Sequence, residues 1–152
     1  MPERPGAFEG IVVPGSGEGA YFVGLGWVRR EIRRVAGFDP YPGTLNLRLL
    51  SADALSRWGG IRRAAGAPLT PPEPGGCGGR LIPARVGGLI RAAVVVPDVT
   101  RYGEELLEIV APVHLRTRLD LKDGDLLRLT IQAVSSGDER KRGERWRSNT
   151  TT

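Results

Sequence analysis

The stretch GFDPYPGTLNLRLL, residues 37–50, places two oxygen-bearing side chains directly after a stiff, proline-containing turn. Strand side chains alternate with period two, so Thr44 and Asn46 share one face while three leucines fall on the other. Mg²⁺ takes oxygen ligands and often completes its shell with water and substrate phosphates. Two neutral oxygens are therefore enough for a magnesium site if a polyphosphate supplies the negative charge. The alternative is a half-exposed strand whose polar side chains face water.

A glycine-rich loop, GSGEGA at residues 15–20, comes before this turn. Glycine accepts the φ angles that let consecutive backbone N–H groups turn toward an anion. The loop is not a Walker A loop, because no Gly-Lys-Ser/Thr follows, and its spacing is not that of a dinucleotide fingerprint. Glu18 would repel phosphate, so we expect it to bond loop backbone, a ribose or the outer shell of a metal. A plain hairpin turn is the alternative.

The segment PVHLR, residues 112–116, combines an expected helix start at Pro112 with His114 and Arg116. Free N–H groups at a helix start and a guanidinium together favour phosphate binding. The alternatives are a solvated arginine and an ordinary surface histidine. Nearby, Glu108 lies in the apolar strand LLEIVAP, where a carboxylate either faces solvent or needs a partner.

The composition limits the class of protein. A chain of 152 residues fits one domain, and its 22 glycines and 12 prolines favour many short strands over long helices. No apolar run is long enough to span a bilayer and no signal peptide is evident, so we expect a cytoplasmic protein without a membrane partner. The single cysteine, Cys77, excludes an internal disulfide and argues against zinc. The net charge of +5 suits a phosphate-bearing small ligand and does not require nucleic acid.

The elements that must position these residues are short. Helical spacing of apolar residues over 26–36 ends at Gly37, and Ser51 is a helix cap, with a third short helix expected from Pro112. Strands are expected at 9–13, from Tyr21, at 44–49, on both sides of a Gly87-Gly88 turn, at 106–110 and at 126–134. About six strands with two or three short helices predict a mainly β fold, a small β-barrel.

Two segments are expected to lie outside this barrel. Residues 67–79 read as an exposed Pro/Gly-rich excursion within the folded domain, 1–135. Residues 136–152 read as a disordered basic tail, because a charged run leads into a Ser/Thr/Asn run without apolar periodicity.

Five motifs, GSGEGAYF, GFDPYPGTLNL, VVVPDVT, LEIVAPVHLR and LKDGD, occur in one order. Together they resemble the CTP-dependent riboflavin kinases of archaea, from about Gly10 to about Val134. The resemblance implies a six-stranded cradle-loop β-barrel. It also implies transfer of the γ-phosphate of CTP to the 5′-hydroxyl of riboflavin, which gives FMN and CDP.

The resemblance also implies roles for individual residues. Thr44 and Asn46 would hold one Mg²⁺, and Thr100 and Glu108 would contact the flavin. Glu108 is further the candidate for orienting, and deprotonating, the ribityl hydroxyl. A non-catalytic barrel that binds nucleic acid or nucleotide is the alternative, and it leaves PGTLN unexplained. The residues implied to hold the nucleotide are Gly15, Ser16, Gly17, Glu18, Gly19, Ala20, Val113, His114, Leu115 and Arg116.

Overall fold

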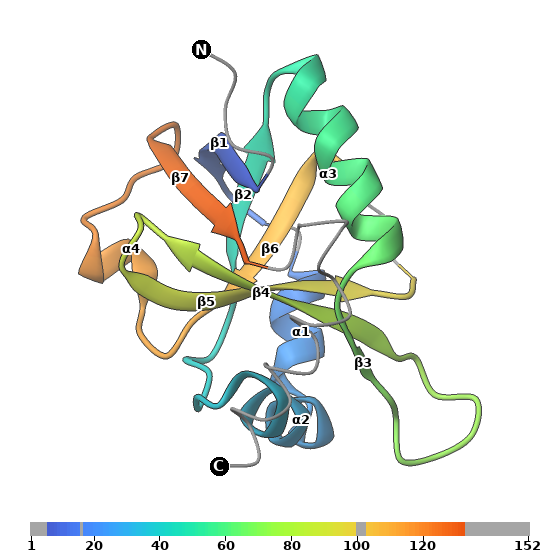
Figure 1. Ribbon diagram of the computed structural model, residues 1–152. Coiled ribbons are helices and arrows are strands. Elements are labelled where there is room, and N and C mark those ends of the chain that lie inside the picture. The colour runs from blue at the N-terminus through green and yellow to red at the C-terminus, as the bar shows by residue number, and fades with distance from the viewer. Residues whose placement is uncertain (1–5, 16, 100–102, 133–152) are drawn as a thin grey trace.

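The computed structural model describes residues 6–15, 17–99 and 103–132 (Figure 1). Ser16, Thr100 and the tail 136–152, for which the sequence carries predictions, lie outside the described residues. The described elements are, in chain order, β1 (Ala7–Val13), α1 (Glu18–Gly24), α2 (Gly26–Ala36), β2 (Leu45–Leu49), α3 (Ala52–Ala64), β3 (Ala67–Leu69), β4 (Gly79–Val86), β5 (Ile90–Pro97), β6 (Leu106–Val110), α4 (Leu115–Arg118) and β7 (Leu126–Ile131).

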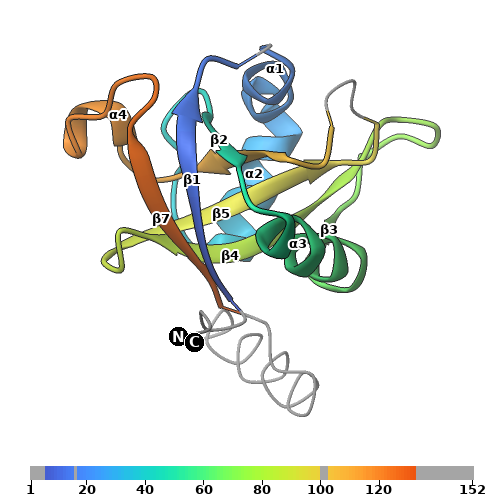
Figure 2. The ribbon, with the colours of Figure 1, turned by 90° about the horizontal axis from the view of Figure 1, so that it is seen from above.

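Six antiparallel strands close into a barrel, which confirms the predicted fold. The strands follow the order β4-β5-β6-β2-β1-β7, and β7 pairs back to β4. One edge of β4 serves two neighbours, because β3 pairs with its start and β7 with its end. The view from above in Figure 2 shows β1 and β7 crossing over β4 and β5, as closure requires. Closure leaves few unpaired strand edges.

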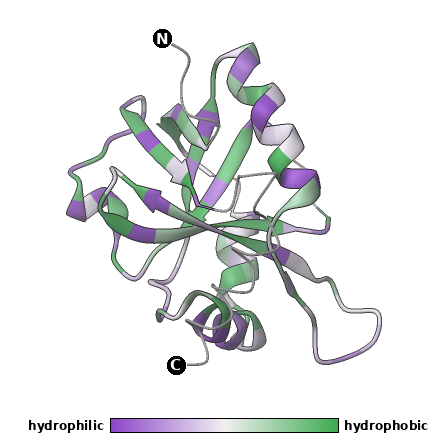
Figure 3. Cartoon of the chain, viewed as in Figure 1, coloured by the Kyte–Doolittle hydropathy of each residue, from purple (hydrophilic) through white to green (hydrophobic). Residues whose placement is uncertain are grey.

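The barrel interior is the larger of two apolar cores. The three leucines of β2 belong to it, as the period-two pattern predicted. Trp58 of α3 joins the same core and meets the Phe8 ring edge-on, with ring centroids 6.3 Å apart. Figure 3 shows hydrophobic segments along the strands, interspersed with hydrophilic ones, and both kinds along α3. The interior leucines thereby fix which side chains of β2 point outward.

A second core lies outside the barrel, under α1 and α2. Phe22 of α1 and Ile32 of α2 pack in one cluster with Val95 of β5 and Val110 of β6. Neighbouring residues of β5, such as Val94, belong to the interior core instead, so this strand is buried on both faces. The outer face of β5 and β6 is therefore covered, and a polar residue on it is not automatically in water.

Local signals in the sequence set several boundaries as predicted. Gly37 ends α2 with a left-handed φ of 78°, which glycine adopts without strain. The Ser51 hydroxyl accepts a hydrogen bond from the backbone N–H of Ala54 at 3.0 Å and so caps α3. Gly87 and Gly88 form the β4–β5 turn with φ of 61° and 81°.

Three predicted elements differ from the structure. The strand expected from Tyr21 is wrong, because α1 occupies 18–24 and buries Gly19, Phe22 and Val23 at helical spacing. The excursion expected at 67–79 begins as strand β3, whose Leu69 is buried in the second core, and residues 72–77 are exposed. The short helix expected from Pro112 begins instead at Leu115.

Candidate active site

Asn46 stands at the centre of a row of residues that crosses three strands. It pairs with Val13 of β1 on one side and with Glu108 of β6 on the other. Its side chain faces away from the leucines of β2, as predicted, but the residue is buried, with 7% of its surface exposed. A Cβ on Gly15 would lie 2.7 Å from Asn46 Cγ and 3.0 Å from Oδ1. The glycine-rich loop therefore covers Asn46, and only a residue without a side chain fits at position 15.

The amide oxygen of Asn46 is an orphan. Within the described part of the chain, Oδ1 is buried and has no hydrogen-bond partner. A buried acceptor left unsatisfied costs about 1–3 kcal/mol. An atom of this kind at a covered, polar position indicates a group that binds there and satisfies it.

Glu108 lies beside Asn46 on β6 and is almost fully buried, with 1% of its surface exposed. The Thr44 hydroxyl donates a hydrogen bond to Glu108 Oε1 at 3.2 Å, across 64 positions of sequence. An added Cβ on Gly19 would overlap both carboxylate oxygens of Glu108. The carboxylate thus sits under the first turn of α1, with Thr44 at its side, rather than on a solvent face.

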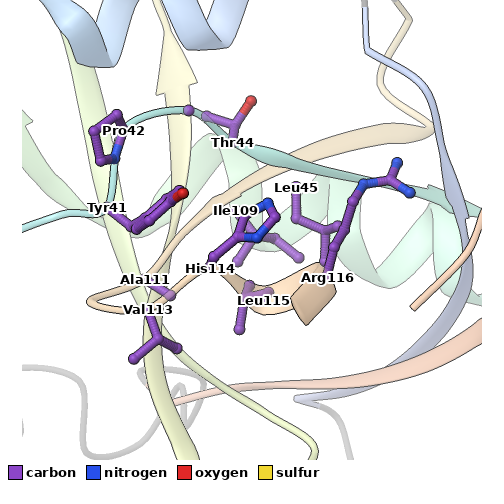
Figure 4. A pocket seen from close by; sticks show the side chains of 11 residues that line it. Tyr41, Pro42, Thr44, Leu45, Ile109, Ala111, Val113, His114, Leu115 and Arg116 are labelled. Carbon is purple, nitrogen blue, oxygen red and sulfur yellow. The ribbon is translucent and has the colours of Figure 1, made fainter. Parts of the chain in front are cut away.

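Thr44 also lines a pocket of about 180 Å³ (Figure 4). Its walls come from residues 41–45, which lead into and begin β2, and from 109, 111 and 113–116, which belong to the end of β6 and the segment after it. The two segments meet because β2 and β6 are antiparallel neighbours. Sites for a whole drug-sized ligand measure roughly 300–1,000 Å³. A pocket of this size suits one part of a larger ligand, and Thr44 joins it to the Asn46–Glu108 row.

Aromatic rings form one wall of the pocket. The Tyr41 ring stacks on the His114 ring, with centroids 4.9 Å apart and an angle of 29° between the planes. Nδ1 of His114 lies 2.6 Å from the Thr117 hydroxyl, which orients the imidazole. Gly43, beside them, has a φ of 102° and open space where a Cβ would be, so a ligand can approach the backbone there.

Arg116 connects the pocket to the glycine-rich loop. Its Nη2 donates to the Asp123 carboxylate at 2.8 Å and, more weakly, to the carbonyl of Val13 at 3.4 Å. Val13 is the last residue of β1, directly before the segment that leads into the loop. Two of the segments expected to hold nucleotide, 15–20 and 113–116, therefore lie next to each other.

The other residues expected to hold the nucleotide differ in their position in the fold and in their burial. Gly17 is the N-cap of α1 with a φ of 90°, and Glu18 and Ala20 lie within α1, not in a loop. Leu115 is buried in the interior core and also lines the pocket. Val113 is half-buried and lines the pocket.

The family of the chain follows from comparison with known proteins. The family model CTP-dep_RFKase, described as "Domain of unknown function DUF120", matches residues 12–131, which is most of the chain. The chain belongs to this family of archaeal CTP-dependent riboflavin kinases. The matched region contains every described residue of the site above.

Curated relatives in the family carry the name riboflavin kinase. A protein of Aeropyrum pernix is 41% identical over 130 residues, which cover 83% of this chain and 96% of the relative. One of Methanocella arvoryzae is 41% identical over 131 residues, and one of Ignicoccus hospitalis is 39% identical over 132. The chain spans just over half of the Methanocella protein, 56%, and 72% of the Ignicoccus protein.

Two further properties concern only the described residues. Among residues 6–15, 17–99 and 103–132, no three His, Cys, Asp or Glu side chains come together as a metal-binding group. In the same part of the chain, no helix combines the length and the apolar character needed to cross a bilayer.

Two residues of the site were not predicted from the sequence. Tyr41 lines the pocket from within the quoted stretch GFDPYPGTLNLRLL, and its position between two prolines is the signal that could have identified it. Asp123, in the motif LKDGD, accepts a hydrogen bond from Arg116. The motif was recognised in the sequence, but no role was predicted for its carboxylates. Tyr41 meets His114 only through the fold, and no spacing rule pairs Asp123 with Arg116.

Proposed function

We propose that the chain is a CTP-dependent riboflavin kinase, which transfers the γ-phosphate of CTP to the 5′-hydroxyl of riboflavin and releases FMN and CDP. The observation that carries the proposal is the convergence of Thr44, Asn46 and Glu108 beneath the glycine-rich loop, with Arg116 at its edge. Family membership and the names of the relatives support the same activity. CTP as donor rests on the family name and is the finer part of the proposal.

The chain's own residues would position the two substrates and stabilise the charge of the transferred phosphate. In the reaction the riboflavin 5′-oxygen forms a bond to the γ-phosphorus, the bond from that phosphorus to the β–γ bridging oxygen breaks, and the hydroxyl proton leaves. Such transfers depend mainly on positioning and electrostatic stabilisation. Glu108 would orient the hydroxyl and accept its proton, with the Thr44 hydrogen bond fixing the carboxylate. Arg116 would bind phosphate oxygens beside the loop.

The residues present fit a divalent ion, which we propose to be Mg²⁺ bound together with the nucleotide. Neutral oxygens from Thr44 and Asn46 would hold it, and the unpartnered Oδ1 of Asn46 is the atom whose burial supports this assignment. An ion there would neutralise phosphate charge during transfer. Two neutral protein ligands suffice when a polyphosphate supplies the negative charge. Thr100, with Glu108, would contact the flavin. We place the reaction in the cytoplasm.

The test is FMN formation from riboflavin and Mg²⁺ with each nucleoside triphosphate in turn, followed by chromatography with fluorescence detection. We expect FMN with CTP, little with ATP, and none after chelation of the metal. FMN formation far faster with ATP than with CTP would overturn the donor assignment. No FMN with any donor, from protein that melts cooperatively, would overturn the kinase assignment.

A further inference from the structure

The turn 121–125, the LKDGD motif, is tied both to the end of β1, which leads toward the glycine-rich loop, and to α4, which carries Arg116. Toward β1, the backbone of Gly124 donates to the Val12 carbonyl at 2.7 Å, and Val12 donates back to the Asp125 carbonyl at 2.8 Å. Toward α4, Leu121 donates to the Arg116 carbonyl at 2.8 Å. The turn therefore fixes the end of β1 and the start of α4 relative to each other.

One side chain of the turn reaches the guanidinium of Arg116. Asp123 Oδ1 accepts from Nη2 at 2.8 Å, and the same nitrogen reaches the Val13 carbonyl at 3.4 Å. A guanidinium has five N–H donors in a rigid fork. In the described part of the chain Nε and Nη1 make no hydrogen bond, and about a third of the side chain, 34%, is exposed. Asp123 thus binds Nη2 of the guanidinium and leaves the N–H groups of Nε and Nη1 for a ligand.

We propose that Asp123 is a positioning residue, which holds the Arg116 guanidinium at the end of β1 so that its remaining N–H groups face the phosphates of the nucleotide. The proposal deepens the proposed function and rests on it for the identity of the anion. An arginine side chain that is already immobilised loses less rotamer freedom on binding, which is worth about 0.5–1.5 kcal/mol of affinity, or about 2–13-fold.

Simple electrostatics makes the opposite prediction, and this makes the proposal testable. Asp123 carries a negative charge close to the expected phosphate site, so its removal should strengthen anion binding if charge alone mattered. Positioning predicts weaker binding when the acceptor is lost. Asp123→Asn separates the two effects, because the amide oxygen still accepts from Arg116 while the charge is gone.

The experiment is calorimetric titration of the full chain with Mg·CTP and, separately, with inorganic tripolyphosphate. We expect Asp123→Ala to weaken binding of both by about 3–10-fold, and Asp123→Asn to bind as tightly as the unaltered chain or more tightly. Arg116→Ala should lower the affinity for both ligands by about 10–100-fold. Adding Asp123→Ala to Arg116→Ala should not lower the affinity further. In turnover assays, the KM for CTP should rise in Asp123→Ala while the KM for riboflavin stays constant.

The matched control is Asp53→Ala. Asp53 accepts from Arg57 at 2.9 Å on α3, an ion pair of similar length outside the site, and its loss should leave both titrations unchanged. Tighter or equal binding by Asp123→Ala, or a further loss when it is added to Arg116→Ala, would overturn the positioning role. If no donor yields FMN while the variants weaken tripolyphosphate binding as expected, the proposed function falls and the positioning role stands. If FMN forms while the variants bind tripolyphosphate like the unaltered chain, the positioning role falls and the proposed function stands.

Discussion

Replacing Gly19 by alanine tests whether the glycine-rich segment acts through Glu108. The added Cβ would overlap both carboxylate oxygens, well inside the 3.0 Å that real Cβ atoms essentially never cross. To restore ordinary contact at about 3.4 Å, the carboxylate or the first turn of α1 must move by on the order of 1 Å. Neither can move freely, because Glu108 sits within a paired strand and α1 packs on the second core.

The expected consequence for activity is larger than that for stability. A misplacement of about 1 Å at a reacting group can lower turnover by roughly 10²-fold. Overpacking of a buried site costs about 1–3 kcal/mol of unfolding free energy, which leaves a folded protein at moderate temperature. We therefore expect Gly19→Ala to fold, to melt at a lower temperature, and to lose kcat at saturating CTP and riboflavin.

The matched control lies in the same helix. Gly24 is the last residue of α1, and nothing lies within 4 Å of the position that its Cβ would take. Gly24→Ala should keep full turnover and melt at the same or a slightly higher temperature. If Gly19→Ala turned over normally, whether or not its melting temperature fell, the contact with Glu108 would be packing alone and the role of Glu108 in orienting the hydroxyl would be refuted.

Three further predictions use the same turnover and melting assays. Asn46→Leu should fold and lose turnover by about 10²–10³-fold, and normal turnover of this variant would exclude the metal role. Asn46→Asp should change the Mg²⁺ concentration needed for turnover, because it keeps an oxygen and adds a charge. Ser51→Ala should lower the free energy of unfolding by about 1 kcal/mol in a urea titration, with kcat unchanged, because only the α3 cap is lost. A chain ending near Gly137 should have the turnover of the full chain, since the tail carries none of the family motifs. A large loss of turnover in the shortened chain would show that the tail is part of the site.

Local signals were sufficient for elements whose limits depend on one or two residues. The α2 end depends on Gly37, the α3 start on Ser51 and the β4–β5 turn on two glycines, and each requirement is visible in the residue type. The inward face of β2 was also predictable, because three leucines at period two leave one choice of face. These predictions needed no information about distant parts of the chain.

The prediction failed where a glycine serves as a buried helix position. Gly19 is buried in α1, but it has no side chain to count as apolar, so the helical spacing with Phe22 and Val23 was invisible. The run Tyr21–Val23 then read as a strand. The start of α4 was misplaced for a related reason. Pro112 permits a helix start but does not require one, and the Ala111 carbonyl instead accepts from the backbone of Tyr41.

The burial of the site also depended on distant residues. The side of β2 on which Asn46 points was predictable, but its cover comes from the loop at Gly15, which no sequence pattern around Asn46 indicates. The Thr44–Glu108 hydrogen bond joins positions 64 apart. Residue types along the chain therefore did not predict what each of these side chains touches.

The register of the barrel strands links core packing to the site. Val13, Asn46 and Glu108 form one row because β1, β2 and β6 pair in a single register, and a slip of one residue would exchange the two faces of β2. The interior leucines of β2 prevent that slip, since it would move them out of the core. The same packing that closes the barrel therefore places an amide and a carboxylate side by side under the glycine-rich segment.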